Sequence, residues 1–205
     1  DLGAGAGTAA LVALAHAPDL TATLVDADAA MLALAARNLA DNGFAGRARV
    51  QDFDVCGGGT ARKAAGLAAD HFGTVIANPP FFAAGRGTPP APLRARARHL
   101  PAGMLEHWVR TAAACAAPGG EAIFIHVAAA LPALLAACER RFGALTVLPL
   151  APRPGAPASR ILLRGRKGGR APLTLLATRA LHEPAGRAFA PEFDAIFCGR
   201  ARLHW

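Results

Sequence analysis

Asp1-Leu2-Gly3-Ala4-Gly5-Ala6-Gly7 begins the sequence and lies between a predicted strand end and a predicted helix that starts near Thr8. Glycines in such a turn adopt backbone conformations barred to other residues, and they let the backbone approach a ligand closely. A dinucleotide-binding loop normally has the spacing Gly-x-Gly-x-x-Gly, with its third glycine one residue later than here. An ordinary tight turn is the alternative, because a glycine motif by itself is a weak signal.

Short apolar runs alternate with stretches of helical length after this loop, which is typical of βαβ units on a parallel sheet. Strands are predicted at 21–25, 49–53, 73–77 and 121–127, and helices at 28–42, 60–71, 102–116 and 131–142. Three further runs, at 145–150, 161–164 and 173–177, have no helix between them and predict antiparallel strands. The sequence therefore predicts an α/β fold, a Rossmann-like, doubly wound, mostly parallel sheet of seven strands with antiparallel C-terminal edge strands.

Acidic residues recur at the ends of successive predicted strands. Asp26 ends the strand after the glycine loop, and Asp54 comes just after the next strand. Open α/β sheets bind ligands at this end of their strands. Asp26 can accept hydrogen bonds from both ribose hydroxyls of an adenosine, and Asp54 from an adenine amine. Asp28 is better explained as a helix cap. The predicted cofactor-binding residues are Asp1, Gly3, Gly5, Gly7, Asp26 and Asp54.

Asn78-Pro79-Pro80-Phe81 directly follows the strand predicted at 73–77. A rigid stop explains the prolines but leaves Asn78 and Phe81 unexplained. A planar nitrogen is a poor nucleophile because its lone pair is delocalised. An asparagine oxygen and a neighbouring carbonyl that accept hydrogen bonds from both N–H groups stabilise the charge that develops there. Proline fixes the Pro79 carbonyl, and a ring at Phe81 stacks on a flat substrate, a contact worth about 1–3 kcal/mol per base.

No general base is needed before the nitrogen attacks, because a cationic nitrogen loses its proton easily. The tetrad therefore predicts group transfer to a planar nitrogen, with Asn78, Pro79, Pro80 and Phe81 as the catalytic residues.

These motifs, together with 24–28, 51–55 and Pro118-Gly119-Gly120, resemble those of the bacterial tRNA adenine-N6 methyltransferase family. The resemblance covers essentially the whole chain. Such enzymes are similar in fold to class I methyltransferases and modify an adenine beside the anticodon of a valine tRNA. The resemblance implies S-adenosylmethionine as the cofactor, bound by the glycine loop, Asp26 and Asp54, and implies that Asn78, Pro79 and Phe81 are catalytic.

Two features depart from the family. Asp26 stands where glutamate is common, and its shorter side chain should still reach the ribose. The family's N-terminal segment, which helps to close the site, is absent. We therefore expect a single methyltransferase domain over 1–205 that is the C-terminal part of a longer protein.

The formal net charge of +8 favours a polyanionic partner, although a compositional bias toward arginine also produces it. One basic cluster lies in the loop after the tetrad, where an RNA backbone would have to lie unless the loop is merely solvated. Its members are Arg86, Arg94, Arg96 and Arg98. A second cluster near the C-terminal strands fits RNA contact and ordinary surface equally well. It comprises Arg160, Arg164, Arg166, Lys167 and Arg170.

The sequence also indicates the cellular compartment in which the protein is expected. It has no run of about 18 apolar residues, so no membrane span is predicted. Its four cysteines lack metal-ligand spacing, which predicts no metal site and favours buried thiols in a reducing cytoplasm.

Methylation of the N6 amine of an adenine in tRNA is the expected function. Two alternatives stay open. One is a protein methyltransferase acting on a glutamine amide, which uses a nearly identical tetrad, typically with tyrosine. The other is a non-catalytic cofactor-binding or RNA-binding module.

Overall fold

A computed structural model describes residues 1–80 and 103–205. The helices in these ranges are α1 (Thr8–His16), α2 (Ala29–Asp41), α3 (Gly59–Ala64), α5 (Met104–Cys115), the 3-10 helix η1 (Ala128–Ala130), α6 (Leu131–Cys138) and α7 (Pro191–Phe197). The strands are β1 (Ala22–Asp26), β2 (Ala48–Asp52), β3 (Phe72–Ala77), β4 (Ala116–Val127), β5 (Gly143–Ala151), β6 (Arg160–Arg166), β7 (Thr174–Leu175) and β8 (Arg179–Ala180). None of the described helices is both long and apolar enough to cross a membrane.

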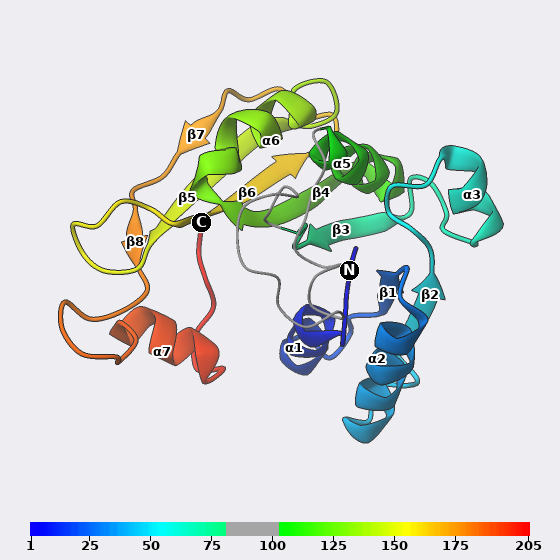
Figure 1. Ribbon diagram of the computed structural model, residues 1–205, viewed down its shortest axis with the longest axis horizontal. Coiled ribbons are helices and arrows are strands. Elements are labelled where there is room, and N and C mark those ends of the chain that lie inside the picture. Colours follow the sequence, from blue (N-terminus) through cyan, green and yellow to red (C-terminus); the bar gives the residue numbers. More distant parts are fainter. Residues whose placement is uncertain (81–102) are drawn as a thin grey trace, which may run out of the picture.

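The strands form one twisted sheet that is joined in its middle by the start of the chain. β1 pairs with β2 on one side, and the order β3-β4-β6-β5-β7 continues on the other. Leu2 makes parallel bridges to both Val25 and Ala77, so it connects the two halves. The predicted Rossmann-like, doubly wound sheet is confirmed (Figure 1).

The C-terminal strands are arranged in a specific way. β6 lies between β4 and β5 and is antiparallel to both, as the absence of intervening helices predicts. The run at 173–177 forms only the short β7, which is parallel to β5. The antiparallel reversal is therefore made by β6, inside the sheet and not at its edge.

Backbone pairing aligns the N-terminal segment with the ends of β1 and β3. The Leu2 amide donates to the Ile76 carbonyl at 2.9 Å, and the Val25 amide donates to the Asp1 carbonyl at 2.9 Å. The next residue of each segment therefore falls in one row across the carboxyl edge of the sheet. That row contains Asp26, Gly3 and Asn78.

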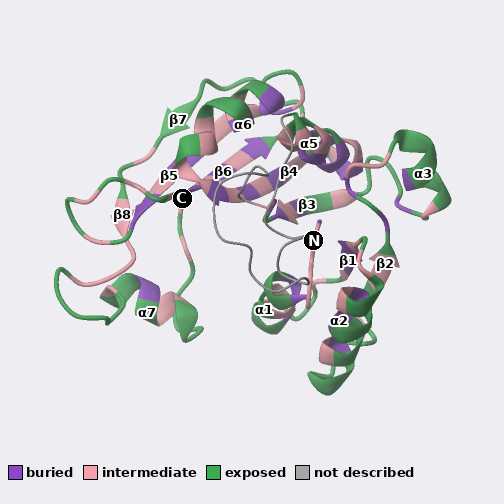
Figure 2. Cartoon of the chain, viewed as in Figure 1, coloured by how far each residue is buried: buried purple, intermediate pink, exposed green. Residues whose placement is uncertain are grey.

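Helices cover both faces of the sheet. In Figure 1, α5 and α6 lie on one face, and α1 and α7 lie on the other. Figure 2 shows buried residues along β4, β5 and β6, the strands between these helices. The main core under α5 and α6 contains Phe124, Val109 and Leu134, while α7 covers β5 through Phe193 packed near Leu148.

The boundaries of α2 follow from its sequence. The Asp28 carboxylate caps the helix by accepting hydrogen bonds from the amides of Ala30 at 2.8 Å and Met31 at 3.3 Å. Gly43 lies just beyond the C-terminal end with φ of 74°, a conformation that favours glycine. The predicted cap is confirmed, and the helix ends close to the predicted residue 42.

Other boundaries differ from the prediction. Helix α3 ends at Ala64, well short of the predicted 60–71, because Gly66 adopts φ of 75° and turns the chain. Strand β4 begins at Ala116, directly after α5. Helix α7 was not predicted, although Pro191 at its start and acidic residues in its first turn are helix-start signals.

Lys167 ties the end of β6 to the neighbouring layer. Its ammonium group donates to Asp70 Oδ1 at 2.5 Å and to the carbonyls of Ala113 at 2.5 Å and Ala116 at 2.9 Å. These carbonyls lie where α5 ends and β4 begins. Lys167 thus has a structural role, which removes it from the basic cluster that the sequence left open for RNA.

We expect Lys167→Gln to lower the free energy of unfolding by about 1–3 kcal/mol, because it leaves carbonyl groups without their charged donor. Arg166→Gln is the matched control, since Arg166 is the exposed neighbour on the same strand. Urea unfolding of both variants measures the difference. Equal stabilities would contradict the structural role of Lys167.

Candidate active site

The carboxyl edge of the sheet borders a cleft of about 1100 Å³. One wall is α1 and the facing wall is α7. The predicted site residues that line it are Asp1, Gly3, Gly5, Asn78, Pro79 and Pro80. Gly7, Asp26 and Asp54 are described but do not line this cleft. The predicted Phe81, Arg86, Arg94, Arg96 and Arg98 lie outside the described residues.

The three glycines of the loop all adopt positive φ, with values of 67° at Gly3, 54° at Gly5 and 88° at Gly7. A Cβ at Gly3 would lie 2.4 Å from the Trp108 ring, and one at Gly7 would lie 2.7 Å from Leu24. A Cβ at Gly5 would meet no atom within 4 Å. The outer glycines are therefore required by packing, while Gly5 leaves open space in the cleft where a ligand can approach the backbone.

Asp26 holds the loop at its middle glycine. Its Oδ2 accepts a hydrogen bond from the Gly5 amide at 2.8 Å, and its Oδ1 accepts one from the Asp28 amide at 3.0 Å. Each carboxylate oxygen can accept more than one hydrogen bond, so the predicted ribose contact stays compatible with this anchoring. The structure thus gives Asp26 a loop-positioning role that the motif did not indicate.

A second anchor escaped prediction altogether. The Asn38 side chain, on α2, donates from Nδ2 to the Ala6 carbonyl at 2.9 Å. Trp108, on α5, forms the surface against which Gly3 packs. Neither residue lies near the loop in sequence, so no local pattern could have identified them.

The other two predicted acids serve local structure. Asp1 Oδ2 accepts a hydrogen bond from the Ala10 amide at 3.3 Å, in the first turn of α1. Asp54 is exposed after β2, and its Oδ1 accepts a hydrogen bond from the Cys56 amide at 2.8 Å, which forms a tight turn. The contact of Asp54 with an adenine amine stays a prediction.

Asn78, Pro79 and Pro80 enter the cleft directly from β3. Asn78 is exposed, Pro79 is fully buried and Pro80 is half-buried. Burial of Pro79 fixes the backbone beside Asn78. Because neighbouring strands are about 4.8 Å apart, Asn78 and Gly3 are separated by one strand spacing. A ligand held by the glycine loop therefore lies beside the Asn78 amide.

His126 supports this segment from within the sheet. It lies on β4, paired with Ile161 of β6, and its side chain is only 2% exposed. Burial lowers the pKa of His126, and so does the nearby Arg160, while hydrogen bonding with the backbone of Pro80 and Val127 acts in the opposite direction. The ring is therefore neutral at neutral pH and lies against the backbone of Pro80.

We expect His126 to make stability depend on pH. A lowered pKa means that the unfolded chain binds a proton near the usual histidine pKa of about 6.5, before the folded chain does. The contribution of neutral His126 to the free energy of unfolding is therefore present above about pH 6.5 and is lost as the pH falls below that value. His126→Gln should flatten the unfolding free energy between pH 7.5 and 5, and the exposed His204→Gln should not. An unchanged slope in His126→Gln would refute this.

The α7 wall of the cleft is largely apolar. Phe197 of α7 is 59% exposed and Val12 of α1 is 55% exposed, and both line the cleft with Ile196. Exposed apolar side chains that face each other across a cleft favour a flat or apolar ligand. The spacing of Phe193, Ile196 and Phe197 is the helical signal that could have revealed this wall.

The cysteines differ in burial. Cys115 and Cys138 are buried, as expected, and burial raises the pKa of Cys138 to about 12. Cys198 is exposed and Cys56 is half-buried, so the expectation of buried thiols does not extend to them. Within the described ranges, no three or more histidine, cysteine or acidic side chains are grouped so that they could hold a metal ion.

The open space at Gly5 fits S-adenosylmethionine, the cofactor that the sequence predicts, and gives a matched test. Gly5→Ala and Gly43→Ala place a Cβ in equally open space at positive φ, so both should cost similar stability, about 1 kcal/mol. Of these two glycines, Gly5 lines the cleft and Gly43 does not. We expect Gly5→Ala alone to weaken the binding of S-adenosylhomocysteine, by tenfold or more in calorimetry. Equal affinities in the two variants would show that the cofactor binds elsewhere.

Comparison with known proteins identifies the family of this chain. The family model of the methyltransferase small domain matches residues 1–148. A solved structure of a predicted O-methyltransferase from Agrobacterium tumefaciens is 36% identical with a TM-score of 0.83, and the match covers 99% of this chain and 89% of that chain. None of the curated proteins matches.

More distant structures share the fold. A geranyl diphosphate C-methyltransferase from Streptomyces coelicolor A3(2), in complex with S-adenosyl-L-homocysteine, is 10% identical with a TM-score of 0.56, over 82% of this chain and 72% of that chain. An O-methyltransferase from neocarzinostatin biosynthesis, in complex with S-adenosylmethionine, is 16% identical with a TM-score of 0.53, over 82% of this chain and 47% of that chain.

The family match, the identity to the Agrobacterium protein and the glycine loop at the carboxyl edge lead to one assignment. The chain belongs to the methyltransferase small domain family, as a class I methyltransferase whose cofactor is S-adenosylmethionine.

Proposed function

We propose that the protein methylates a planar nitrogen, the exocyclic N6 amine of an adenine in RNA, with tRNA as the substrate class. One observation carries the proposal. The Asn78-Pro79-Pro80 segment and the glycine loop line the same cleft, one strand spacing apart. Hydrogen-bond acceptors for an amine are thereby placed beside the methyl-donor site.

The chain's own groups activate the amine. Bound S-adenosylmethionine supplies an electrophilic methyl group. The Asn78 side-chain oxygen and the Pro79 carbonyl accept hydrogen bonds from the two N–H groups, which draws the nitrogen lone pair out of conjugation. The buried Pro79 ring keeps that carbonyl fixed, so little reorganisation is needed during the reaction. The methylated nitrogen then loses its proton to water.

Nitrogen suits the described cleft better than a hydroxyl acceptor, which must be deprotonated by a nearby base. The titratable side chains with carboxylate or imidazole groups that line the described cleft are Asp1 and His16. The Asp1 carboxylate bonds the first turn of α1, and His16 ends that helix, about 12 Å along the axis from Thr8. The Agrobacterium relative is described as a predicted O-methyltransferase, so O-methylation is the rival.

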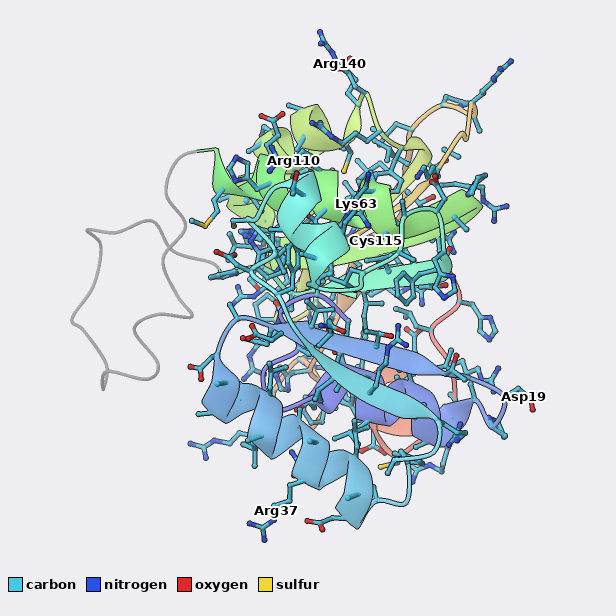
Figure 3. All side chains as sticks on the ribbon, turned by 90° about the vertical axis from the view of Figure 1, so that its right-hand side faces the viewer. Asp19, Arg37, Lys63, Arg110, Cys115 and Arg140 are labelled. Atoms are coloured by element: carbon cyan, nitrogen blue, oxygen red, sulfur yellow. The ribbon has the colours of Figure 1, made fainter. Side chains whose placement is uncertain are left out.

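Positive charge supports RNA as the substrate class. The support comes from where a positive side chain lies, and not from the net charge of the whole chain. Arg37 and Arg140 project from opposite ends of the side shown in Figure 3, and Arg37 pairs with Asp41 at 3.5 Å. Such scattered charges do not define a nucleic-acid surface. Arg47 and Lys167 instead bind carbonyl groups within the fold. Among the described residues, the informative cation is Arg160, which lines the cleft.

The tetrad chemistry predicts that Asn78→Ala lowers kcat by about 100- to 1000-fold, because it removes one of the two groups that stabilise the developing charge. Binding of S-adenosylhomocysteine should be preserved. Asn42→Ala is the control, since Asn42 lies exposed at the far end of α2. Transfer of a radiolabelled methyl group measures the effect, and wild-type turnover in Asn78→Ala would rule out the mechanism.

The acceptor is identified by offering total tRNA and a protein extract, each with labelled cofactor, and analysing the products by mass spectrometry. N6-methyladenosine is the expected product. Methylglutamine in protein would support the glutamine alternative, and a methyl ether would support O-methylation. Binding of cofactor without transfer to either pool would indicate a non-catalytic module.

A further inference from the structure

We propose that Arg160 binds an anionic group of the methyl acceptor, so that the site selects a nucleotide over an uncharged nucleoside or amide. The identification of that group as a phosphate rests on the proposed function. The presence of a cationic side chain at this point in the cleft rests on the structure alone.

The topology brings Arg160 to the reacting end of the cleft. Because β6 runs antiparallel to β4, its first residue lies at the carboxyl edge, where the parallel strands end. Arg160 pairs there with Val127, the last residue of β4. It lines the same cleft as Asn78, Pro79 and Pro80. A guanidinium far away in sequence is thus placed beside the segment that receives the amine.

The charges of the cleft are separated along its length. Asp1 adjoins the glycine loop that would hold the cationic methyl donor, and Arg160 lies across the sheet on the side of Asn78 and β4. Among the described residues that line the cleft, Arg160 is the one arginine or lysine. This polarity matches a cationic methyl donor and an anionic acceptor.

Two other basic residues of the C-terminal region, Arg164 and Arg179, lie outside the cleft and make contacts within the fold. Arg164 stacks on Trp205 with 4.8 Å between its Cζ and the ring centroid. Arg179 pairs with Glu192 at 2.5 Å. Arg160 Nη1 donates to the Ser159 carbonyl at 3.0 Å, which holds the guanidinium at the rim of the cleft. A planar guanidinium presents several N–H donors in a fork that matches the oxygens of a phosphate.

The apolar wall completes a nucleotide-shaped site. Ile196 and Phe197 line the cleft together with Arg160. A base offers a flat face to such side chains, and its phosphate offers charge to the arginine. An uncharged acceptor would offer no anionic group to the guanidinium.

The kinetic test compares Arg160→Gln and Arg160→Lys with Arg166→Gln. Arg166 is exposed and lies on β6, six residues from Arg160. It lies opposite Glu121 in the β4–β6 register and does not line the cleft. With total tRNA, Arg160→Gln should raise KM about 10- to 100-fold, the loss expected for one charge-assisted hydrogen-bonded contact. Arg160→Lys should raise KM less, because lysine keeps the positive charge. The slope of log KM against log salt should fall by about one in Arg160→Gln. Affinity for S-adenosylhomocysteine and all values for Arg166→Gln should stay at wild type.

A binding test separates this inference from the proposed function. Calorimetry with S-adenosylhomocysteine present compares AMP with adenosine on the wild-type protein. AMP should bind at least tenfold more tightly, and Arg160→Gln should bind both alike. If tRNA is not methylated but this preference holds, the proposed function fails and the anion site stands. Equal binding of AMP and adenosine by the wild type, or an unchanged KM in Arg160→Gln, would overturn the inference.

Discussion

The site depends on the backbone pairing of Asp1 and Leu2 between β1 and β3. Leu2 bridges Val25 on one side and Ala77 on the other, so the segment is fixed by hydrogen bonds in both directions. Parallel register then places Gly3 between Asp26 and Asn78. A slip of one residue would turn each side chain to the opposite face of the sheet. The alignment of the glycine loop with Asn78 is therefore a consequence of strand register more than of any side-chain contact.

Preorganisation of the loop follows from that register. Trp108 and Leu24 press on the outer glycines, and Asp26 and Asn38 hold the backbone between them. Only Gly5 faces open space in the cleft. The fixed parts come from α2, α5 and β1, so three elements of the core share in positioning one loop. Such support is what keeps a binding loop in its productive geometry before the ligand arrives.

The sequence predicted what depends on local pattern and missed what depends on tertiary contact. Strand ends, the Asp28 cap and the two motifs are readable because spacing and residue type determine them locally. The loop anchors Asn38 and Trp108 are not readable, since their partners lie far away in the chain. The basic cluster predicted near the C-terminal strands wrongly included Lys167, because its ammonium group binds backbone carbonyls within the fold. Arg160 was grouped with it by sequence, yet the antiparallel β6 separates the two by the length of a strand.

The central claim is that the glycine loop and Asn78 form two halves of one reaction site. A crystal structure with S-adenosylhomocysteine and AMP tests it most directly. We predict that the cofactor lies along the glycine loop with its sulfur on the Asn78 side, and that the adenine amine lies within hydrogen-bonding distance, about 3 Å, of the Asn78 oxygen and the Pro79 carbonyl. A cofactor bound away from Gly5, or an amine out of reach of Asn78 with both ligands present, would contradict it.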